Sequence, residues 1–447
     1  MSSSTVEPQN SDSSNRSPKA HGSHTKPVAA NLLSERASLA QGQAIGKLMA
    51  QALKYPELIS LAAGFVDNAT LPCEATRESM QALVTDDSKL RRALQYDSTA
   101  GDRAFRECLA EWSYRDTPKC TPDPDRVILT AGSNQFLHLL SEAILDPGDI
   151  VITAAPTYFV YLGTLKGVGA KVIGVRADED GMCMDSLEAT LAELKASGEA
   201  KRLKAIYTVT EFDNPAGSTL TLERRLRLLQ LAESWHADTG PLLILSDNAY
   251  ELLRYEGEAL PSLLSLSDRA DEYVIELGTF SKSFSPGIRV GWGVVPESLV
   301  NVLLDMKSNM DFGSPHFSQM LVHEALASGD LDRHLPTIRE GYKAKLEAML
   351  EALEVAFSGV EGVQWRRPQG GLYVWLTLPQ SVDTTEGGAL WNAAVENGVL
   401  YVPGHHCFPP HGEPVAKNTI RLSFGVQDAE RIRDGIQKLA SAVASVA

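Results

Sequence analysis

The sequence has few cysteines, fewer basic than acidic residues and no long hydrophobic run. Its five cysteines are scattered without a C-x-x-C pair, which argues against a disulfide framework or a zinc site and favours reduced thiols in the cytoplasm. The 41 Lys and Arg residues stand against 57 Asp and Glu residues, and the net charge of −16 repels nucleic acid and anionic lipid. No apolar stretch approaches the length of a membrane span. We therefore expect no nucleic-acid partner and no membrane insertion.

Two common enzyme motifs are also missing from the sequence. There is no G-x-S-x-G, which argues against a serine hydrolase, and no G-x-G-x-x-G after a first strand, which argues against a Rossmann dehydrogenase. The run HHC at 405–407 is a poor metal site because adjacent residues rarely bind one ion. We expect no bound metal.

The length of 447 residues favours more than one domain. Residues 1–30 are polar and rich in Ser, Asn and Pro, as expected of a disordered tail. We expect residues 31–75 to form an N-terminal arm and part of a small domain. Residues 76–325 are expected to form a large cofactor-binding domain and residues 326–447 a small α+β domain.

Short apolar runs alternate with helical stretches through the middle of the chain. The runs are VILTA, DIVITAA, KVIGV, AIYTV, LLILSD, VIEL and RVGWGVV, and most lack polar alternation, as expected of strands that are covered on both faces. This pattern predicts an α/β fold with a mainly parallel sheet and helices on both faces. Ligands of such sheets bind beyond the carboxyl ends of the strands.

The residues that follow the first two runs suit an anionic, planar ligand. Gly132, Ser133 and Asn134 follow VILTA and open a helical pattern, whose free N–H groups favour a phosphate. Tyr158 follows DIVITAA, where its ring can lie against a flat group. An ordinary N-cap serine and a core tyrosine are the alternative interpretations.

Two further strand ends carry an amide, a carboxylate and a phenol. Asn214 precedes a proline after AIYTV, which favours an extended backbone that presents the amide. Asp247 ends LLILSD and Tyr250 follows one turn later. A carboxylate at the end of an apolar strand needs a cationic or hydrogen-bonding partner. Turn chemistry and helix capping are the alternatives for these residues.

The segment LGTFSKSFSPGIRVGW places Lys282 and Arg289 close together, with the hydroxyls of Thr279 and Ser281 beside them. Two nearby cations suit a site that holds an anion between them or that keeps the lysine neutral. Burial and a neighbouring arginine both lower the pKa of a lysine and so favour its neutral form. Pyridoxal phosphate offers a phosphate, a flat ring, a phenolic oxygen, a pyridine nitrogen and an aldehyde. The residues after the strands supply a partner for each of these groups.

The chain resembles the fold type I pyridoxal-phosphate aminotransferases of class I/II, especially aminoadipate, kynurenine and valine-pyruvate members. The motifs that carry the likeness are SKSFSPGIRVGW, GSNQFL, DNPAG, SDNAY, LQYDSTAGDRAFRE, RPQGGLYVW, YVPGHHCF and IRLSFG. The resemblance implies a large domain with a seven-stranded type of sheet. It also implies that Lys282 forms a Schiff base with the cofactor and that Arg289 binds its phosphate.

The same resemblance implies roles for residues far from the lysine motif. Tyr96 would reach the phosphate of a neighbouring subunit in a homodimer, and Arg421 would bind the substrate α-carboxylate. We also expect Asn214 and Gly64 to contact substrate, and Lys282, Asp247 and Tyr158 to be catalytic. The cofactor would be held by the following residues: Tyr96, Ser133, Asn134, Tyr158, Asn214, Asp247, Tyr250, Thr279, Ser281, Lys282 and Arg289.

The expected reaction moves an amino group from an L-amino acid to a 2-oxo acid. Other pyridoxal reactions stay open at this point, namely decarboxylation, elimination and cyclising lyase chemistry, because substrate orientation selects among them. A ligand sensor built on the same domain is a further alternative, although the polar tail leaves no room for a DNA-binding module in front of it. The sequence does not select a substrate side chain.

Overall fold

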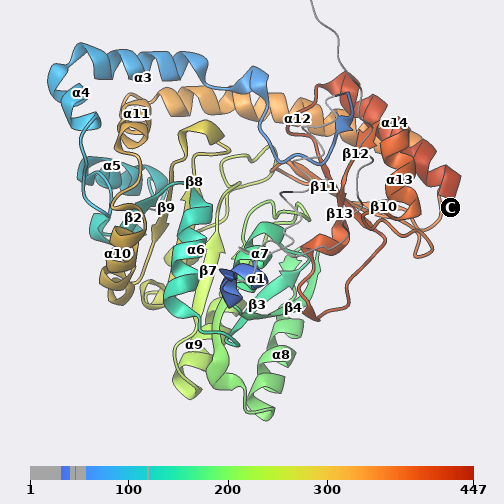
Figure 1. The fold of residues 1–447 in the computed structure, drawn as a ribbon, viewed down its shortest axis with the longest axis horizontal. Coiled ribbons are helices and arrows are strands. Elements are labelled where there is room, and N and C mark those ends of the chain that lie inside the picture. The colour runs from blue at the N-terminus through green and yellow to red at the C-terminus, as the bar shows by residue number, and fades with distance from the viewer. Residues whose placement is uncertain (1–31, 41–45, 47–56, 118–119, 447) are drawn as a thin grey trace, which may run out of the picture.

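The structure is a computed structural model of the 447-residue chain and describes residues 32–40, 46, 57–117 and 120–446 (Figure 1). The expected tail at residues 1–30 lies outside the described residues, as do residues 31, 41–45 and 47–56 of the region 31–75 that is expected to form the arm. The arm contributes the short helix α1 (Glu35–Leu39). The described part of the chain contains no helix that is long and apolar enough to cross a membrane.

The largest sheet is built mainly from parallel strands, as the sequence predicts. Its body has the order β4-β3-β6-β7-β8-β9-β2, and the two-residue strands β14 (His411–Gly412) and β5 (Gly181–Met182) both pair with β4. Strand β9 alone runs antiparallel to both of its neighbours within this body. The seven body strands are β2 (Val127–Thr130), β3 (Ile150–Ala155), β4 (Lys171–Asp178), β6 (Leu203–Val209), β7 (Leu243–Asp247), β8 (Val274–Thr279) and β9 (Gly291–Val294).

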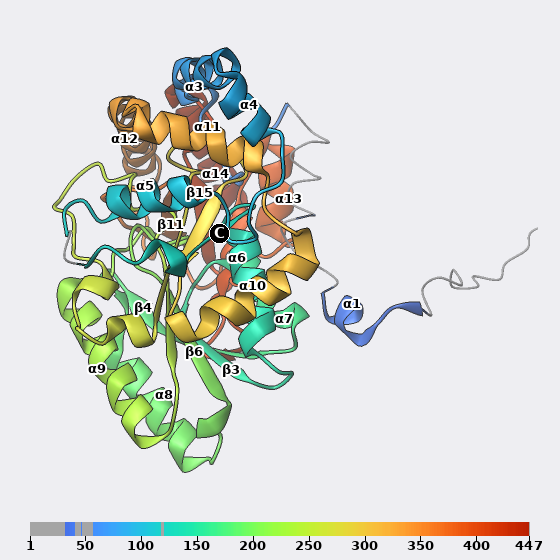
Figure 2. The same ribbon diagram turned by 90° about the vertical axis from the view of Figure 1, so that its left-hand side faces the viewer.

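Both faces of this sheet are apolar because both are covered by helices (Figure 2). Successive strand side chains point to opposite faces, so Val151 joins one buried cluster while Ile150 and Ile152 join another. One face packs against α6 (Ser133–Ile144), α7 (Phe159–Gly167) and α10 (Glu297–Asp311). The other packs against α5 (Arg103–Ser113), α8 (Met184–Ala196), α9 (Leu222–Asp238) and α11 (His316–Ala327).

A second, smaller sheet lies beside the first. It has the order β10-β11-β15-β13, and all its neighbouring strands are antiparallel. A separate parallel pair joins β1 to β12. These strands are β1 (Ile59–Ser60), β10 (Gln364–Trp365), β11 (Tyr373–Thr377), β12 (Val399–Leu400), β13 (Val402–Pro403) and β15 (Thr419–Ser423).

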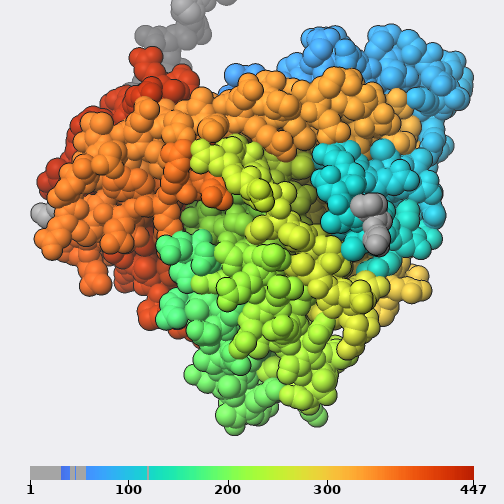
Figure 3. Space-filling view, turned by 180° about the vertical axis from the view of Figure 1, so that it is seen from behind, coloured from blue at the N-terminus to red at the C-terminus, as the bar shows by residue number. Residues whose placement is uncertain are grey.

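The long helix α12 (Asp330–Phe357) connects the two regions (Figure 3). Leu331 and Leu335 belong to the cluster under the large sheet, whereas Leu346 and Leu353 belong to the cluster that includes the small sheet. The remaining helices pack around these elements: α3 (Cys73–Thr85), α4 (Asp87–Ala93), α13 (Ala389–Glu396) and α14 (Ala429–Val446). The helix therefore fixes one sheet relative to the other.

Close packing of β9 against α6 requires a glycine at position 293. A Cβ atom there would lie 2.0 Å from the Phe136 ring, which is far inside van der Waals contact. Phe136 is fully buried, so its ring has little room to move. Helix α6 can therefore lie directly on the strand.

We predict that Gly293→Ala lowers the free energy of unfolding by about 1–3 kcal/mol, because overpacking displaces Phe136. Urea denaturation measures the loss. Gly167→Ala is the matched control, since its Cβ would make an ordinary 3.7 Å contact with Ala40. Equal denaturation midpoints for the two variants would contradict the packing argument.

Candidate active site

The carboxyl ends of β3, β6, β7 and β8 lie at one edge of the large sheet, because these strands are parallel in register. A cavity of about 300 Å³ lies at this edge. Its lining combines residues from both sheets and from the segment after β1: Ala62, Ala63, Gly64, Phe65, Asn134, Tyr158, Phe159, Val160, Asn214, Tyr250, Lys282, Tyr373, Val402 and Arg421. Seven of the residues expected to form the site thus face one cavity.

Lys282 is the amine of this cavity. Its Nζ donates a 2.7 Å hydrogen bond to the carbonyl oxygen of Gly64. Burial lowers the pKa of Lys282, and the positive charges of Arg421 and Arg289 lower it further. These effects increase the fraction of the amine that is neutral and nucleophilic.

Asp247 ends β7 as a buried carboxylate. The hydroxyl of Tyr207 donates to its Oδ2 at 2.8 Å, and the Ala249 N–H donates to its Oδ1 at 3.2 Å. Burial raises the pKa of Asp247 to about 6, although these two hydrogen bonds oppose the rise. A cation near this carboxylate would restore its ionised form.

A cradle for an anion lies where α6 begins. Gly132 precedes the helix with φ 83°, and no side chain caps the first helical N–H groups. A Cβ atom at Gly132 would lie 2.3 Å from Nη2 of Arg289, so only glycine lets the guanidinium approach the helix end. Arg289 donates to Ser281 Oγ at 3.3 Å, and the Thr279 hydroxyl bonds to Ser281 Oγ at 2.9 Å. Together with Ser133, these groups can hold a phosphate.

Hydrogen-bonding groups line the wall between the amine and the carboxylate. The Asn214 amide donates from Nδ2 to the Tyr250 hydroxyl at 3.4 Å. Tyr158 donates to Oδ1 of Asn134 at 3.2 Å, and burial raises the pKa of Tyr158 well above its ordinary value. Burial also raises the pKa of Tyr250, so both phenols keep their protons at neutral pH.

Arg421 enters the cavity from β15 of the small sheet. Its guanidinium is buried and donates to Oδ1 of Asn214 at 3.0 Å and to the carbonyl oxygen of Ala62 at 2.7 Å. The rings of Tyr373 and Phe159 lie 4.4 Å and 5.3 Å from it. Its buried Nε has no hydrogen-bond partner. A buried cation with an unused donor suits an anionic ligand such as a carboxylate.

These groups fit pyridoxal phosphate. The cradle at α6 accepts a phosphate, Asp247 accepts a protonated ring nitrogen, and Lys282 can bond the aldehyde. The absence of a Cβ at Gly132 lets the Arg289 guanidinium, which can bind a phosphate, lie against this helix end. Tyr250 and Asn214 offer hydrogen bonds to a phenolic oxygen.

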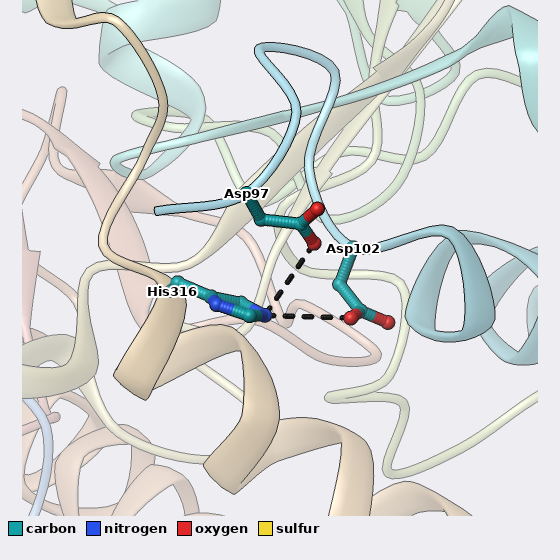
Figure 4. A group of neighbouring side chains, drawn as sticks. All are labelled: Asp97, Asp102 and His316. Carbon is teal, nitrogen blue, oxygen red and sulfur yellow. Dashed lines mark hydrogen bonds and ion pairs between the residues drawn. The ribbon is translucent and has the colours of Figure 1, made fainter. Parts of the chain in front are cut away.

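Tyr96 lies outside the cavity of its own chain. Its side chain is 78% exposed and contacts the exposed ring of Phe312 edge-on, with centroids 5.3 Å apart. Next to it lies a cluster of Asp97, Asp102 and His316 (Figure 4). The structure therefore does not bring Tyr96 to the other predicted residues within one subunit.

Hydrogen bonds and ion pairs explain this cluster without a metal. His316 Nδ1 bonds to the carbonyl oxygen of Gln95 at 3.1 Å, and Nε2 lies 3.3 Å from Asp102. Asp102 also accepts from the Phe105 N–H and from Arg92. The bond to Asp102 raises the pKa of His316. The His316 ring thus holds the loop that carries Tyr96.

Sequence reasoning missed three aromatic residues of the site. Tyr207 bonds to Asp247 from the neighbouring strand, Tyr373 faces the cavity from β11, and Phe159 lies against Arg421. The run GGLYVW contains Tyr373, but nothing in its spacing indicates that its side chain faces the lysine. Tyr207 lies within a buried apolar run and looks like an ordinary core residue.

The fold and site define a pyridoxal-phosphate enzyme, and comparison with known proteins gives its family. Residues 56–439 match the model for aminotransferase class I and II. The chain is 37% identical over 389 residues to aromatic-amino-acid aminotransferase 1 of Thermococcus litoralis, covering 87% of this chain and 88% of that protein. The chain belongs to the class I and II aminotransferases, and pyridoxal phosphate is its cofactor.

Two solved structures share the whole architecture. The multiple substrate aminotransferase of Thermococcus profundus has a TM-score of 0.85 and 35% identity, covering 94% of this chain and 99% of that one. The α-aminoadipate aminotransferase of Thermus thermophilus, solved with N-(5'-phosphopyridoxyl)-L-leucine, has a TM-score of 0.81 and 31% identity, with coverage of 94% and 99%. The predicted fold class is confirmed.

We predict that Asp247→Asn stabilises the cofactor-free protein at high pH. The pKa of Asp247 is about 6 in the folded chain against an ordinary 3.8, so ionisation lowers the free energy of unfolding as pH rises between these values. The variant should be more stable than the wild type by about 1–3 kcal/mol at pH 8 and nearly equal to it at pH 4.

Urea denaturation of the cofactor-free proteins at the two pH values checks this prediction. Asp268→Asn is the control, because Asp268 is exposed and its replacement should have the same small effect at both pH values. A gain for Asp247→Asn that is as large at pH 4 as at pH 8 would show that burial of the charge is not the cause.

Proposed function

We propose that this aminotransferase takes an amino group from an apolar or aromatic L-amino acid and delivers it to a 2-oxo acid, with Lys282 as the residue that bonds the cofactor. The proposal rests on two groups that face the same cavity: the half-buried amine of Lys282, whose pKa is lowered, and the buried, incompletely bonded guanidinium of Arg421. An amino acid has one amine and one carboxylate to meet these two groups.

Arg421 binds the α-carboxylate of the substrate in this proposal. Its unpartnered Nε and its Nη groups supply charge-assisted hydrogen bonds, each worth about 1.5–3 kcal/mol. Asn214 accepts from the same guanidinium and thereby fixes its plane. The carboxylate would then hold the α-carbon near the Nζ of Lys282.

Lys282 has two tasks. As a neutral amine it bonds the cofactor, and once released it takes the proton from the substrate α-carbon at its Nζ and returns a proton later. When bound, pyridoxal phosphate supplies an aldehyde for amines and a ring that accepts electrons from the α-carbon. The lowering of the Lys282 pKa suits both tasks.

The remaining predicted residues hold the cofactor. Asp247 keeps a proton on the ring nitrogen, and Tyr158 lies against the ring. Ser133, Thr279, Ser281 and Arg289 bind the phosphate, while Asn134 orients Tyr158 through the hydrogen bond between them. Tyr250 donates to the phenolic oxygen.

The substrate class follows from the rest of the lining. After the residues assigned above are set aside, the cavity wall is almost entirely apolar: Ala62, Ala63, Gly64, Phe65, Phe159, Val160, Tyr373 and Val402. Lys282 and Arg421 are the cations among the described lining residues, and both already have a task. A second substrate carboxylate would lack a partner, which is costly in a buried site. Similarity to an aromatic-amino-acid aminotransferase supports the same preference.

We further propose a homodimer in which Tyr96 of each subunit completes the phosphate site of the other. The exposure of Tyr96 and Phe312 supports this arrangement, because an aromatic pair of this size is seldom left in water. His316 holds the Tyr96 loop in place from α11.

We also propose a cytoplasmic location, no nucleic-acid or membrane partner, and a division of the chain into a large and a small domain. All five cysteines are free, which supports a reducing cytoplasm, and the net charge of −16 supports the absence of a nucleic-acid or membrane partner. Pairing of β1 with β12 supports an N-terminal region, 31–75, that contributes to a small domain of residues 326–447. Residues 76–325 then form the large domain.

The first test is the visible spectrum of the purified protein with pyridoxal phosphate. Aromatic and branched L-amino acids should remove the cofactor's visible band, and a 2-oxo acid should restore it. Because a second carboxylate is left unpaired, kcat/KM for phenylalanine should exceed that for aspartate by about tenfold or more. Borohydride reduction and peptide mass analysis should find the cofactor on Lys282.

Lys282→Ala should lose the reducible link and nearly all turnover, whereas the surface control Lys438→Ala should keep both. A reducible link that survives Lys282→Ala would refute the choice of lysine. If an amino acid removes the visible band and a 2-oxo acid does not restore it, amino transfer is refuted. A higher kcat/KM for aspartate than for phenylalanine would refute the substrate class.

The dimer is tested by mixing two defective variants, Tyr96→Ala and Lys282→Ala. If Tyr96 acts across the interface, each hybrid dimer holds one intact site, and random reassociation should restore about one quarter of wild-type activity. Activity is measured before and after dissociation and reassociation. No recovery, although hybrids form, would show that Tyr96 acts within its own subunit or not at all.

A further inference from the structure

Tyr373 lies where the two halves of the site meet. It is the first residue of β11, is buried, and pairs with Ser423 of β15, while Trp375 pairs with Arg421. Tyr373 and Arg421 are therefore diagonal neighbours on one face of the small sheet, within reach of a long side chain. The Arg421 guanidinium lies 4.4 Å from the Tyr373 ring, at cation–π distance.

The hydroxyl of Tyr373 reaches the opposite side of the cavity. It lies 3.3 Å from the hydroxyl of Tyr250, and a Cβ at Gly64 would lie 2.7 Å from it. The carbonyl of Gly64 accepts from Lys282, so the phenol lies beside the segment that holds the amine. Gly371, with φ 75°, donates to the Leu253 carbonyl at 3.0 Å and so brings β11 to the turn that carries Tyr250.

The acidities of the two phenols indicate which one donates. Burial raises the pKa of Tyr373, but the charges of Arg421 and Lys282 outweigh it and place that pKa below the ordinary value. Burial raises the pKa of Tyr250 well above its ordinary value, and Tyr373 adds to the rise. Either hydroxyl can donate at this 3.3 Å separation, and the lower pKa favours Tyr373 as the donor. Tyr250, which already accepts from the Asn214 amide, then keeps its own proton for the cavity. The charged or titratable groups that face Tyr373 are Lys282, Arg421, Tyr250, Tyr158, Tyr342 and Cys407.

We propose that Tyr373 is a positioning residue with two separable parts. Its hydroxyl donates to Tyr250, so that the Tyr250 proton points toward the phenolic oxygen of the cofactor, and its ring supports Arg421 where the substrate carboxylate binds. The inference rests on the proposed roles of Tyr250 and Arg421.

Two variants separate the parts. Tyr373→Phe keeps the ring under Arg421 and removes the hydroxyl, so kcat should fall about three- to tenfold with KM for phenylalanine changed less than about twofold. Tyr373→Leu also removes the ring. The Kd for 3-phenylpropionate, a carboxylate without an amine, should then rise about tenfold, and it should hardly change in Tyr373→Phe.

The spectrum of the bound cofactor gives a readout that does not depend on turnover. Without the Tyr373 hydroxyl, Tyr250 donates a weaker hydrogen bond to the phenolic oxygen of the cofactor. That oxygen then keeps more negative charge, and because of this charge a nearby proton is held more tightly. The pH midpoint of the absorption change in Tyr373→Phe should therefore rise by about 0.5–1 pH unit. Tyr401→Phe is the control, because its buried hydroxyl bonds to the Thr384 carbonyl at 3.0 Å outside the cavity.

A stability test on cofactor-free protein is independent of the proposed function. One hydrogen bond joins Tyr373 and Tyr250, and either single change to Phe removes it. The double variant Tyr250→Phe/Tyr373→Phe should therefore lower the denaturant midpoint about as much as the more damaging of the two single variants does. Single effects that simply add would overturn the hydroxyl pair even if no cofactor binds.

With the cofactor bound, wild-type kcat and an unchanged pH midpoint in Tyr373→Phe would overturn the role of the hydroxyl while leaving that of Lys282 intact. Equal changes in Tyr401→Phe would also overturn it, because any lost tyrosine hydroxyl would then suffice. An unchanged Kd for 3-phenylpropionate in Tyr373→Leu would overturn the role of the ring.

Discussion

The central constraint in this protein is that two basic side chains, the half-buried Lys282 and the buried Arg421, face one cavity. Within the part of the chain that the structure describes, neither Lys282 nor Arg421 forms an ion pair with a carboxylate. An unpaired buried charge costs several kcal/mol. Neutral oxygens and aromatic faces reduce that cost, but the site still favours a bound anion beside Arg421 and a neutral amine at Lys282. In the proposed function the substrate carboxylate supplies that anion.

Three separate segments of the chain meet at this cavity. Lys282 comes from the end of a strand of the large sheet and Arg421 from the small sheet. The segment after β1 lies between them, where the Ala62 carbonyl accepts from Arg421 and the Gly64 carbonyl accepts from Lys282. A shift of one sheet against the other would break one of these bonds. Helix α12, which packs against both clusters, keeps the sheets in register.

Sequence patterns predict the parts of the site that depend on short segments. Continuous apolar runs indicate strands covered on both faces, and Lys282 and Asp247 follow such runs, so their meeting at one sheet edge can be foreseen. Tyr207 and Tyr373 could not be identified in this way. Each gains its role from a partner on another strand or another sheet, and neither the register nor the sheet-to-sheet contact is encoded in local spacing.

Burial favours the uncharged forms of both Asp247 and Lys282. It raises the pKa of Asp247 and lowers that of Lys282, because in both cases the charged form loses its hydration. In the proposed function the neutral form of the lysine is the reactive one, so burial promotes that function directly. The role proposed for the aspartate needs its ionised form, which a cationic partner would restore. The Tyr207 hydroxyl already favours the ionised form, and a protonated ring nitrogen would favour it further. In that proposal one physical effect activates Lys282 and makes Asp247 selective for a ligand that brings a positive charge.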